Sequence, residues 1–399
     1  MDAYARFRKE AIAFSLTLAL CGPVCVAAEP FEWQIVWPTT QGFSPEKLDA
    51  LRDSLAQRGT KALLIVRNDK IVCEWYAPGH GVEKKHYTAS MAKALVGGMS
   101  LLVALNDGLI AVDDPAWRYI PQWANDPVRS KITIRHLATH SAGIEDAEAS
   151  EQDRLAARQR GVTLTAEHMS LPGWKGGFWR QEPDPFTLAR DEAPVIFTPG
   201  TQYAYSNPGM GMLSYAVTAS LKGSPYSDIR TLLRDRIMRP IGVRDSAWSI
   251  GYGKTFEVDR LRLVANWGGG SYTARATARV GLLMLHKGNW QGKQLIESRW
   301  VEEVVRPAGT PLPGQPPGNP QPASGLGWWT NADGVWPQVP RDAFAGAGAG
   351  NQVLLVVPSL DLIVVRNGAN LYDPSQGKGF WGGLERHLFN PLMAAIGGP

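Results

Sequence analysis

Two stretches of the chain concentrate apolar and β-branched residues in the way that is typical of β-hairpins. The first consists of residues 62–67 and 71–76, joined by the polar turn 68–70. The second consists of residues 352–357 and 362–366, joined by Pro-Ser-Leu-Asp. Runs of this kind on both sides of a polar turn predict paired strands. We therefore expect strands near both ends of the chain.

Apolar residues at helical spacing predict helices between and after these hairpins. The longest carries Ser90 and ends at Asn106-Asp107-Gly108, where glycine is the expected terminator. The remaining predicted helices begin or lie at 131–137 (with Thr133 as N-cap), 209–221, 227–238, 273–286 and 380–396. Residues from about 145 to 200 and from 307 to 323 are rich in Pro and Gly, so we expect irregular structure there.

This order of elements predicts an α+β fold. The economical arrangement is one antiparallel sheet built from both chain ends, flanked by helices, with a mainly helical lobe inserted. We place the sheet lobe at about 29–108 and 270–399 and the helical lobe at about 109–269.

The N-terminus has the pattern of a secretory signal peptide. Arg6, Arg8 and Lys9 precede an apolar stretch, and small residues end it at Ala28. We therefore expect residues 1–28 to be removed and 29–399 to be a periplasmic or secreted bacterial protein. An uncleaved membrane anchor is the alternative, whereas Leu20 before Cys21 disfavours a lipoprotein.

Composition adds few constraints. The chain has 399 residues, 44% of them hydrophobic, and a formal net charge of +4, with no basic block of the kind that binds nucleic acid. Two of the 3 cysteines lie in the signal segment, which leaves Cys73 without an internal disulfide partner. The 15 tryptophans fill the core or wall a pocket, and the sequence leaves both interpretations open.

Ser90 and Lys93 lie three residues apart in the predicted helix. That spacing places both side chains on one helical face. A serine hydroxyl needs a nearby base to become a nucleophile, and a lysine whose pKa is lowered by burial is suitable. As a bare pattern Ser-x-x-Lys is common, and a stray serine beside a lysine whose stem lies along the surface would look the same.

A second cluster, Tyr205-Ser206-Asn207-Pro208-Gly209, lies about a hundred residues further on. Its Pro and Gly indicate a tight loop or a helix start. A tyrosine beside a lysine cation ionises more easily and is a candidate base for a serine, while an asparagine offers a donor and an acceptor to an amide-like substrate. A core tyrosine and a capping asparagine are the alternative interpretation.

A third cluster, Phe344-Ala345-Gly346-Ala347-Gly348-Ala349-Gly350, enters the C-terminal hairpin. Its small side chains leave the backbone bare, as an oxyanion hole on a strand requires. A close crossing of two strands would select the same residues.

Together the three clusters resemble the serine β-lactamase and penicillin-binding-protein superfamily, in the branch similar to class C β-lactamases, esterases and 6-aminohexanoate-dimer hydrolase. Further similar stretches are 108–115, 132–144, 199–207, 268–270 and 358–365, so that the resemblance covers roughly residues 40 to 395. It implies a β-lactamase-like fold and an exported serine hydrolase that needs no cofactor and acts on a small ester or amide.

The resemblance implies roles for individual residues. Ser90 would be the acylated nucleophile, Lys93 and Tyr205 would share the acid and base work, and Asn207 would position the substrate. The third motif is placed at residues 346–348, so that Gly348 and Ala349 line the substrate and the amide of Ala349 joins the oxyanion hole. The lysine or histidine that the family carries on this strand is absent, which favours small esters or linear amides over penicillins.

Three alternatives remain open from the sequence. The first two are enzymes, a β-lactamase and a peptidoglycan DD-peptidase. The third is a binding or sensor protein that kept the fold without catalytic activity. His140 and His136 allow a Ser-His-Asp arrangement, although their stretch is one that the family uses structurally. We expect no metal, because neither His-Glu-x-x-His nor paired Cys-x-x-Cys occurs. We also expect neither nucleic acid nor, once the signal is cleaved, a membrane as a stable partner.

Overall fold

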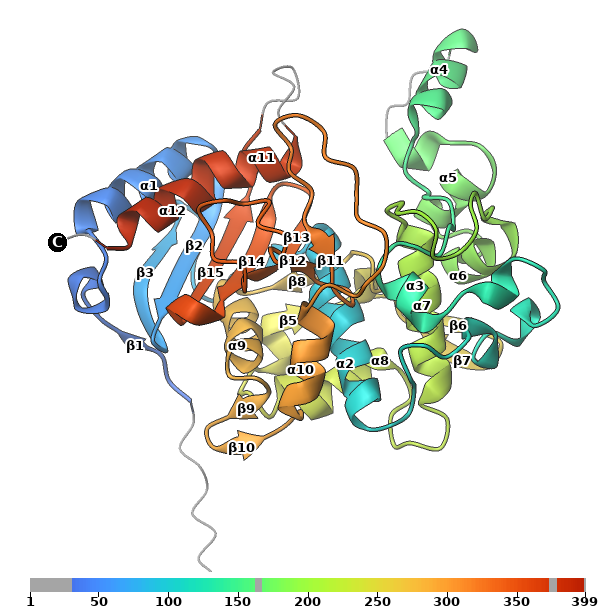
Figure 1. Ribbon diagram of the computed structural model, residues 1–399, viewed down its shortest axis with the longest axis horizontal. Coiled ribbons are helices and arrows are strands. Elements are labelled where there is room, and N and C mark those ends of the chain that lie inside the picture. The colour runs from blue at the N-terminus through green and yellow to red at the C-terminus, as the bar shows by residue number, and fades with distance from the viewer. Residues whose placement is uncertain (1–30, 162–166, 373–378, 398–399) are drawn as a thin grey trace, which may run out of the picture. The chain divides into compact units, whose positions relative to one another are not determined.

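A computed structural model describes residues 31–161, 167–372 and 379–397 of the chain (Figure 1). The predicted signal peptide, residues 1–28, lies outside this range. Residues 33–399 form one compact unit, and the description below concerns this unit. The division into a sheet lobe and a helical lobe with the boundaries given above stays a prediction.

An eight-stranded sheet forms the centre of the unit, with the strand order β1-β3-β2-β15-β14-β13-β12-β11. Both predicted hairpins are present, as β2 and β3 and as β14 and β15. The strands are β1 (Gln34–Ile35), β2 (Thr60–Arg67), β3 (Lys70–Tyr76), β11 (Ala323–Ser324), β12 (Trp329–Thr330), β13 (Phe344–Gly348), β14 (Gln352–Val357) and β15 (Leu362–Gly368). Strand β15 pairs with β2, which joins the two chain ends in one sheet as predicted.

One pairing differs from the antiparallel expectation. Strand β1 runs parallel to β3, with Gln34 opposite Lys70. Helix α1 (Pro45–Gln57) follows β1 and leads into β2. Strand β1 is therefore not part of the β2–β3 hairpin, and it lies at the edge of the sheet next to β3. The other pairings of the large sheet are antiparallel.

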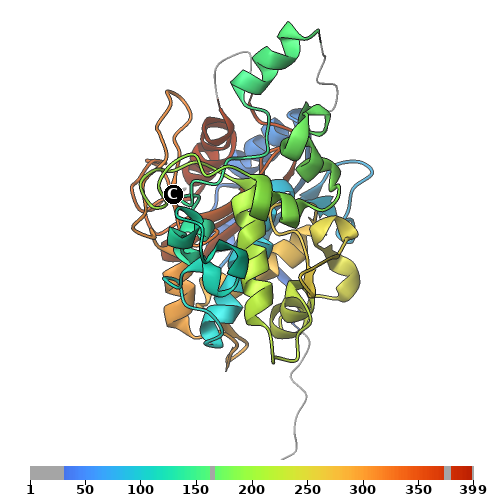
Figure 2. The ribbon, with the colours of Figure 1, turned by 90° about the vertical axis from the view of Figure 1, so that its right-hand side faces the viewer.

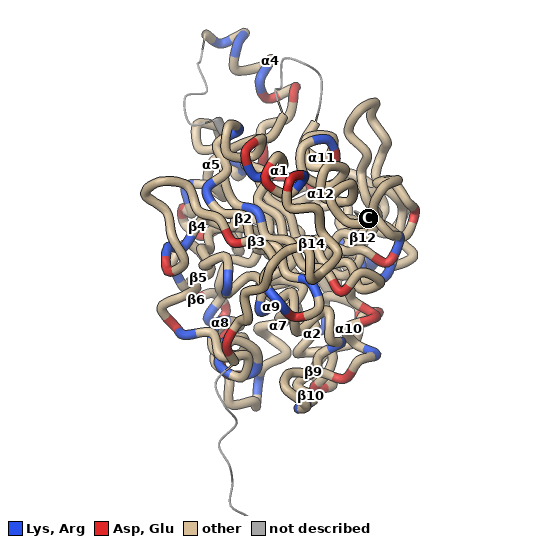
Figure 3. The backbone as a smooth tube through the Cα atoms, turned by 90° about the vertical axis from the view of Figure 1, so that its left-hand side faces the viewer, with Lys and Arg blue, Asp and Glu red and all other residues tan. Residues whose placement is uncertain are grey.

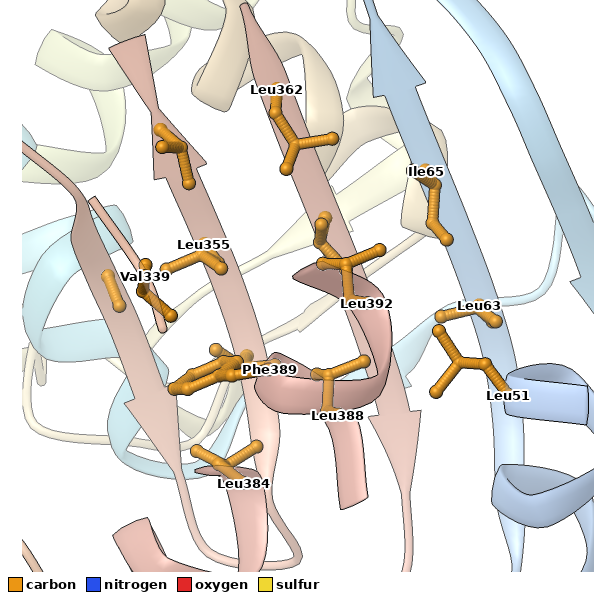
Figure 4. Packing of buried hydrophobic residues seen from close by; sticks show 14 of the residues in the cluster. Leu51, Leu63, Ile65, Val339, Leu355, Leu362, Leu384, Leu388, Phe389 and Leu392 are labelled. Carbon is orange, nitrogen blue, oxygen red and sulfur yellow. The ribbon is translucent and has the colours of Figure 1, made fainter. Parts of the chain in front are cut away.

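Helices from both chain ends cover one face of the sheet. They are α1, α11 (Phe380–Leu384) and α12 (Asn390–Ala395), the last two joined by the π-helical turn Glu385–Phe389. Figure 4 shows Leu388 and Phe389 pointing from these helices toward Leu63 and Leu355 on the strands. This buried cluster fixes the closing helical run that the sequence placed at 380–396.

Helix α9 (Ala274–Leu285) packs on the other face, against β14 and β15. Thr273 caps it and His286 follows it, as predicted for 273–286. Beside it lies the segment that carries Ser90, which ends in α2 (Met99–Asn106), and α2 in turn contacts α10 (Ser298–Val305). The run Ala89–Asn106 is long and apolar enough to span a membrane, but it is mostly buried inside the fold, as a core helix is.

The inserted region contains more helix than the sequence indicated. Helix α7 (yellow-green in Figure 2) runs through it. The α-helices of the inserted region are α3 (Ile134–Ala138), α4 (Glu151–Gln159), α5 (Gly173–Arg180), α6 (Pro185–Thr187), α7 (Asn207–Ser220) and α8 (Ile229–Leu233). The prediction of irregular structure over 145–200 was therefore wrong for α4, α5 and α6, whereas 307–322 is loop as expected.

Short strand pairs complete the unit. Strand β8 (Ser271–Tyr272) lies between β4 (His86–Tyr87) and β5 (Trp248–Ser249), and this small sheet leads directly into the Ser90 segment. Two further pairs are β6 (Phe256–Val258) with β7 (Leu261–Leu263), and β9 (Asn289–Trp290) with β10 (Lys293–Gln294). Figure 3 shows basic and acidic residues interspersed over the side that it presents, consistent with the small net charge.

Candidate active site

The Ser90 segment differs from the regular helix that the sequence predicted. It begins with the 3-10 turn Ala89–Met91, continues as the π-helical turn Lys93–Gly98 and becomes α-helical only at Met99. The turn is anchored by the Thr88 amide, which donates to Gly270 O at 2.9 Å. A 3-10 turn has three residues, so side chains three apart still share a face. Accordingly, Lys93 Nζ lies 3.2 Å from Ser90 Oγ.

Lys93 is almost completely buried, and its amine is held on several sides. Besides Ser90, Nζ contacts Asn207 Oδ1 at 2.6 Å and Trp267 O at 3.0 Å. It also lies 4.6 Å from the centre of the Tyr205 ring. Burial lowers the pKa of Lys93 to about 7, although the carboxylates of Asp146 and Glu148 oppose this shift. The lowered pKa confirms the expectation from its apolar helical surroundings.

Tyr205 lies directly beside the serine, with its hydroxyl 2.7 Å from Ser90 Oγ. Burial, chiefly, raises the pKa of Tyr205 well above its ordinary value, and the nearby Glu148 raises it further. The expectation that this tyrosine ionises easily was therefore wrong, because desolvation of the phenolate and two neighbouring carboxylates outweigh the lowering of its pKa by the hydrogen bond with Ser90.

Asn207 is the first residue of α7, which Ser206 caps by accepting from Gly209 N at 2.9 Å. The sequence had left a loop or a helix start open at this position, and the structure shows a helix start. The cap fixes the direction of α7, so Tyr205 just before it and Asn207 just inside it both contact the Ser90–Lys93 pair.

The third cluster forms β13, whose glycines face the serine segment. A Cβ atom added at Gly348 would lie 2.6 Å from both Ser90 N and Met91 N, and one added at Gly346 would lie 2.8 Å from Ala94 Cβ. The intervening Ala345 and Ala347 belong to the core under the terminal helices. Alternation along the strand thus explains the Gly-Ala pattern: only glycine lets β13 approach Ser90 this closely. Ala349 follows in an exposed turn.

Arg366 is the basic residue closest along the sheet to this motif, and it points the other way. It pairs with Val353 and Leu63, which both face the core under the terminal helices. Its guanidinium donates to Thr60 Oγ1, Gly350 O and Asn351 O. Arg366 therefore supports the turn after β13 from behind and does not replace the missing cation.

The two histidines have structural contacts. His136 completes the cap of α3, since its Nδ1 accepts from Thr133 N at 3.2 Å. His140 Nδ1 accepts from Ser206 N, and its ring is tilted by 33° against the Tyr205 ring, with the ring centroids 4.7 Å apart. Burial, chiefly, lowers the pKa of His140 to about 3. Within the described part of the chain neither histidine hydrogen-bonds to Ser90, so the Ser-His-Asp arrangement is not present there.

Sequence reasoning missed two acidic residues of the site. Asp146 Oδ1 accepts from Asn207 N at 2.8 Å and from Asn207 Nδ2 at 3.0 Å, and Glu148 Oε1 lies 3.3 Å from the same Nδ2. The segment Glu145-Asp146-Ala147-Glu148 is visibly acidic, but nothing in its spacing connects it with Asn207, some sixty residues away. Over the described ranges no group of three or more His, Cys, Asp and Glu side chains is arranged to hold a metal ion.

Comparison with known families agrees with this geometry. The family model described as Beta-lactamase matches residues 48–374, most of the chain. The chain belongs to the beta-lactamase family. Its order of Ser-x-x-Lys, Tyr-x-Asn and a glycine-containing strand is thus the arrangement of a serine hydrolase family, and the superfamily resemblance found in the sequence is confirmed.

Individual relatives are distant but cover most of this beta-lactamase family chain. The 6-aminohexanoate-dimer hydrolase of Paenarthrobacter ureafaciens is 23% identical over 356 residues, which are 88% of this chain and 82% of that protein. Among solved structures, a D-stereospecific amidohydrolase from Streptomyces has a TM-score of 0.58 at 16% identity and covers 88% of this chain and 97% of its own. A family VIII carboxylesterase has a TM-score of 0.57 at 15% identity, with 88% and 99% covered. The protein is a hydrolase with the β-lactamase-like fold.

Proposed function

We propose that this protein is an exported serine hydrolase that forms an acyl-enzyme on Ser90 and acts on small esters or linear amides. The observation that carries the proposal is the environment of the Lys93 amine. A neutral amine has two N–H bonds and one lone pair. Two acceptors, Asn207 Oδ1 at 2.6 Å and Trp267 O at 3.0 Å, take the two N–H bonds, which directs the lone pair to Ser90 Oγ at 3.2 Å.

This arrangement makes Lys93 the base of the first step. Its lowered pKa leaves a large neutral fraction near pH 7, and a base is most effective when its pKa lies near the working pH. Ser90 Oγ attacks the substrate carbonyl carbon while its proton passes to Lys93 Nζ. Tyr205, kept neutral by burial, donates its hydrogen bond to Oγ before the attack.

The tetrahedral intermediate then loses its leaving group. The carbon–oxygen or carbon–nitrogen bond of the substrate breaks, and the departing atom takes a proton from the Tyr205 hydroxyl, which Lys93 restores. In the second half of the reaction water attacks the acyl carbon and gives one proton to neutral Lys93. The bond between the acyl carbon and Ser90 Oγ then breaks, the acid leaves, and Oγ takes that proton back from Lys93. Lys93 and Tyr205 thus act as one proton-transfer unit, consistent with the contacts of both groups with Ser90 Oγ, at 3.2 Å and 2.7 Å.

The amides of Ser90 and Ala349 are proposed to bind the negative oxygen of the intermediate. Support comes from the close approach of β13, where a Cβ at Gly348 would lie 2.6 Å from Ser90 N. Backbone N–H groups at such a crossing are held without flexible side chains, as an oxyanion hole requires.

Substrate class follows from charge. Strand β13 offers glycine and alanine where a carboxylate-binding cation would stand, and Arg366 faces the opposite side of the sheet. The names of the relatives, which include a dimer hydrolase, an amidohydrolase and a carboxylesterase, point the same way. We therefore propose esters of short acids or linear amides rather than penicillins.

Export remains part of the proposal on the strength of the N-terminal pattern alone. We propose removal of residues 1–28 and a periplasmic or secreted location, with a small molecule as partner and no nucleic acid or membrane. N-terminal sequencing of protein from the periplasmic fraction of a bacterial host tests this, because a start at Glu29 is expected and a start at Met1 would contradict it.

The decisive experiment for the reaction is covalent labelling with a fluorophosphonate, read by mass spectrometry of the intact protein and its peptides. We expect one adduct, on Ser90, and turnover of p-nitrophenyl butyrate that the label abolishes. Ser90→Ala, which keeps the fold, is the matched control and should neither label nor turn over. A labelled Ser90→Ala protein would show that another residue is the nucleophile.

A further inference from the structure

The orientation of the Asn207 amide depends on a carboxylate that does not touch the serine. Asp146 Oδ1 accepts both from the Asn207 backbone amide at 2.8 Å and from its Nδ2 at 3.0 Å. An ionised carboxylate only accepts hydrogen bonds, so it binds the NH₂ end of a carboxamide and excludes the oxygen end. The amide oxygen is thereby turned toward Lys93 Nζ, 2.6 Å away.

We infer that Asp146 is a positioning residue of this hydrolase: it holds Asn207 so that the amide oxygen binds the Lys93 amine, and its charge sets how readily Lys93 becomes neutral. The inference rests on the proposed function, since it concerns the base of that reaction. A flipped Asn207 would present NH₂ hydrogens to the lysine, remove one of its two acceptors and free its lone pair to point away from Ser90.

Several titratable groups face Lys93 from the elements packed around it. Asp146 and Glu148 approach from the loop after α3, His140 from the end of α3, and Tyr205 from the segment before α7. Burial keeps the last two neutral near pH 7, because it lowers the pKa of His140 and raises that of Tyr205.

Two further tyrosines near the carboxylates are also neutral in this range. Burial, chiefly, raises the pKa of Tyr203, with Asp146 adding to the effect, and raises the pKa of Tyr252 to about 12. The charge felt by Lys93 near pH 7 thus comes from the two acidic residues.

The sign of the effect follows from this set of charges. The negative charge of Asp146 favours the ammonium form and raises the pKa of Lys93, against the larger lowering by burial. Burial and the neighbouring Glu148 raise the pKa of Asp146 itself. Removing the Asp146 charge should therefore lower the pKa of Lys93. The acid limb of the pH–rate profile, where the rate rises with pH as Lys93 loses its proton, should then move to lower pH. An opposite charge within about 4–6 Å typically shifts a pKa by about one unit or more.

Two substitutions separate charge from positioning. Asp146→Asn is isosteric and retains a carbonyl oxygen that accepts from both Asn207 donors, so it removes mainly the charge. Asp146→Ala removes the charge and the acceptor, and leaves the NH₂ group of Asn207 with the longer 3.3 Å contact to Glu148 Oε1, so that the amide is held less firmly. Glu46→Gln is the control. Glu46 is an exposed carboxylate on α1, which covers the face of the sheet opposite to the Ser90 segment.

The experiment measures the second-order rate of Ser90 labelling by a fluorophosphonate from pH 5 to pH 9 in the wild type and the three variants. We expect Asp146→Asn to shift the acid limb down by roughly one pH unit. Asp146→Ala should show the same shift and a plateau lower by about tenfold or more, on the scale of general-base effects. Glu46→Gln should follow the wild type at every pH.

The outcomes distinguish this inference from the proposed function. A wild-type protein that does not label at Ser90 would refute the proposed function itself. A wild type that labels normally, with an Asp146→Asn profile whose midpoint is unmoved or displaced upward, would refute the effect of the Asp146 charge on Lys93. An Asp146→Ala plateau as high as that of Asp146→Asn would refute the positioning of Asn207. Both results leave the proposed function standing. A merely structural role would scale the rate equally at every pH and leave the midpoint in place.

Discussion

Substituting Gly348 by alanine tests whether β13 is part of the reaction centre. A Cβ at this position would meet Ser90 N, Met91 N and Thr88 O, each at 2.6 Å. Carbon in ordinary contact stays about 3.4 Å or more from such atoms, so the strand or the turn must move by roughly 0.8 Å. All three atoms belong to the backbone, and no side chain can rotate away to make room.

The expected loss follows from that displacement. Misplacing a reacting group by about 1 Å costs on the order of a hundredfold in rate, or roughly 2.7 kcal/mol in the activation barrier. Overpacking costs about 1–3 kcal/mol of stability, which a protein with a core of this size survives. We therefore expect Gly348→Ala to fold, to unfold at a moderately lower temperature, and to lose about a hundredfold in kcat/KM for p-nitrophenyl butyrate.

Gly314→Ala is the matched control, since nothing lies within 4 Å of the position of its Cβ and its φ is not left-handed. It should keep the wild-type kcat/KM. The assay is ester hydrolysis at saturating and limiting substrate, with thermal unfolding followed in parallel. If Gly348→Ala retained half or more of the wild-type kcat/KM, β13 would not form the oxyanion hole at this crossing, and the third motif would have to be placed elsewhere.

Further predictions concern the proton-transfer unit and the substrate. Ser90→Ala should remove nearly all ester hydrolysis while circular dichroism stays unchanged. Lys93→Arg should retain less than about a tenth of the wild-type rate, because arginine keeps its proton at working pH; a steady-state assay showing more would remove Lys93 from the mechanism. The kcat/KM of the wild type should rise with pH through about 7, since the neutral form of Lys93 is the base, and a pH–rate profile that falls across this range would contradict the assignment. Finally, kcat/KM should be clearly higher for p-nitrophenyl butyrate than for nitrocefin, because a missing charge-assisted hydrogen bond is worth about 1.5–3 kcal/mol.

The sheet was predictable from the sequence because its strands are buried on both faces. The runs at 62–67 and 352–366 are almost continuously apolar, and they become β2, β14 and β15 at the centre of the sheet. The spacing of Ser90 and Lys93 was equally informative, since a turn of any helical type brings residues three apart together.

What the sequence did not indicate depends on contacts between distant segments. Helix α5 was missed because its stabilising contacts are tertiary: Lys175 on α5 bridges Glu145 and Asp153 at 2.7 Å each. Helix α4 does carry a local signal, the capping box of Ser150 and Asp153, which the prediction of irregular structure overlooked. The neutral state of Tyr205, like helix α5, was missed because it depends on tertiary contacts. Its proximity to a lysine was correctly inferred, but burial and the carboxylates of Asp146 and Glu148 decide its pKa, and neither effect is visible in the local sequence.

The charged groups around Ser90 bear on the substrate class that we propose. The basic side chain that contacts Ser90 among the described residues is Lys93, whose pKa is lowered toward neutrality by burial. Asp146 and Glu148 stand on the same side, behind Asn207. A site with a weakly charged amine and two carboxylates repels a substrate carboxylate.

Arg366, on the sheet, does not offset the negative charge of these two carboxylates. Its buried guanidinium lies across the sheet, donating to the carbonyl oxygens of Gly350 and Asn351. These contacts stabilise the turn that follows β13, and the side chain lies on the face of the sheet that the terminal helices cover. In the proposed function, selection against anionic substrates would therefore arise from three separate segments, the glycine strand, the acidic loop and the orientation of Arg366. Introducing a lysine at one strand position would consequently not be sufficient to convert this site into one that prefers penicillins.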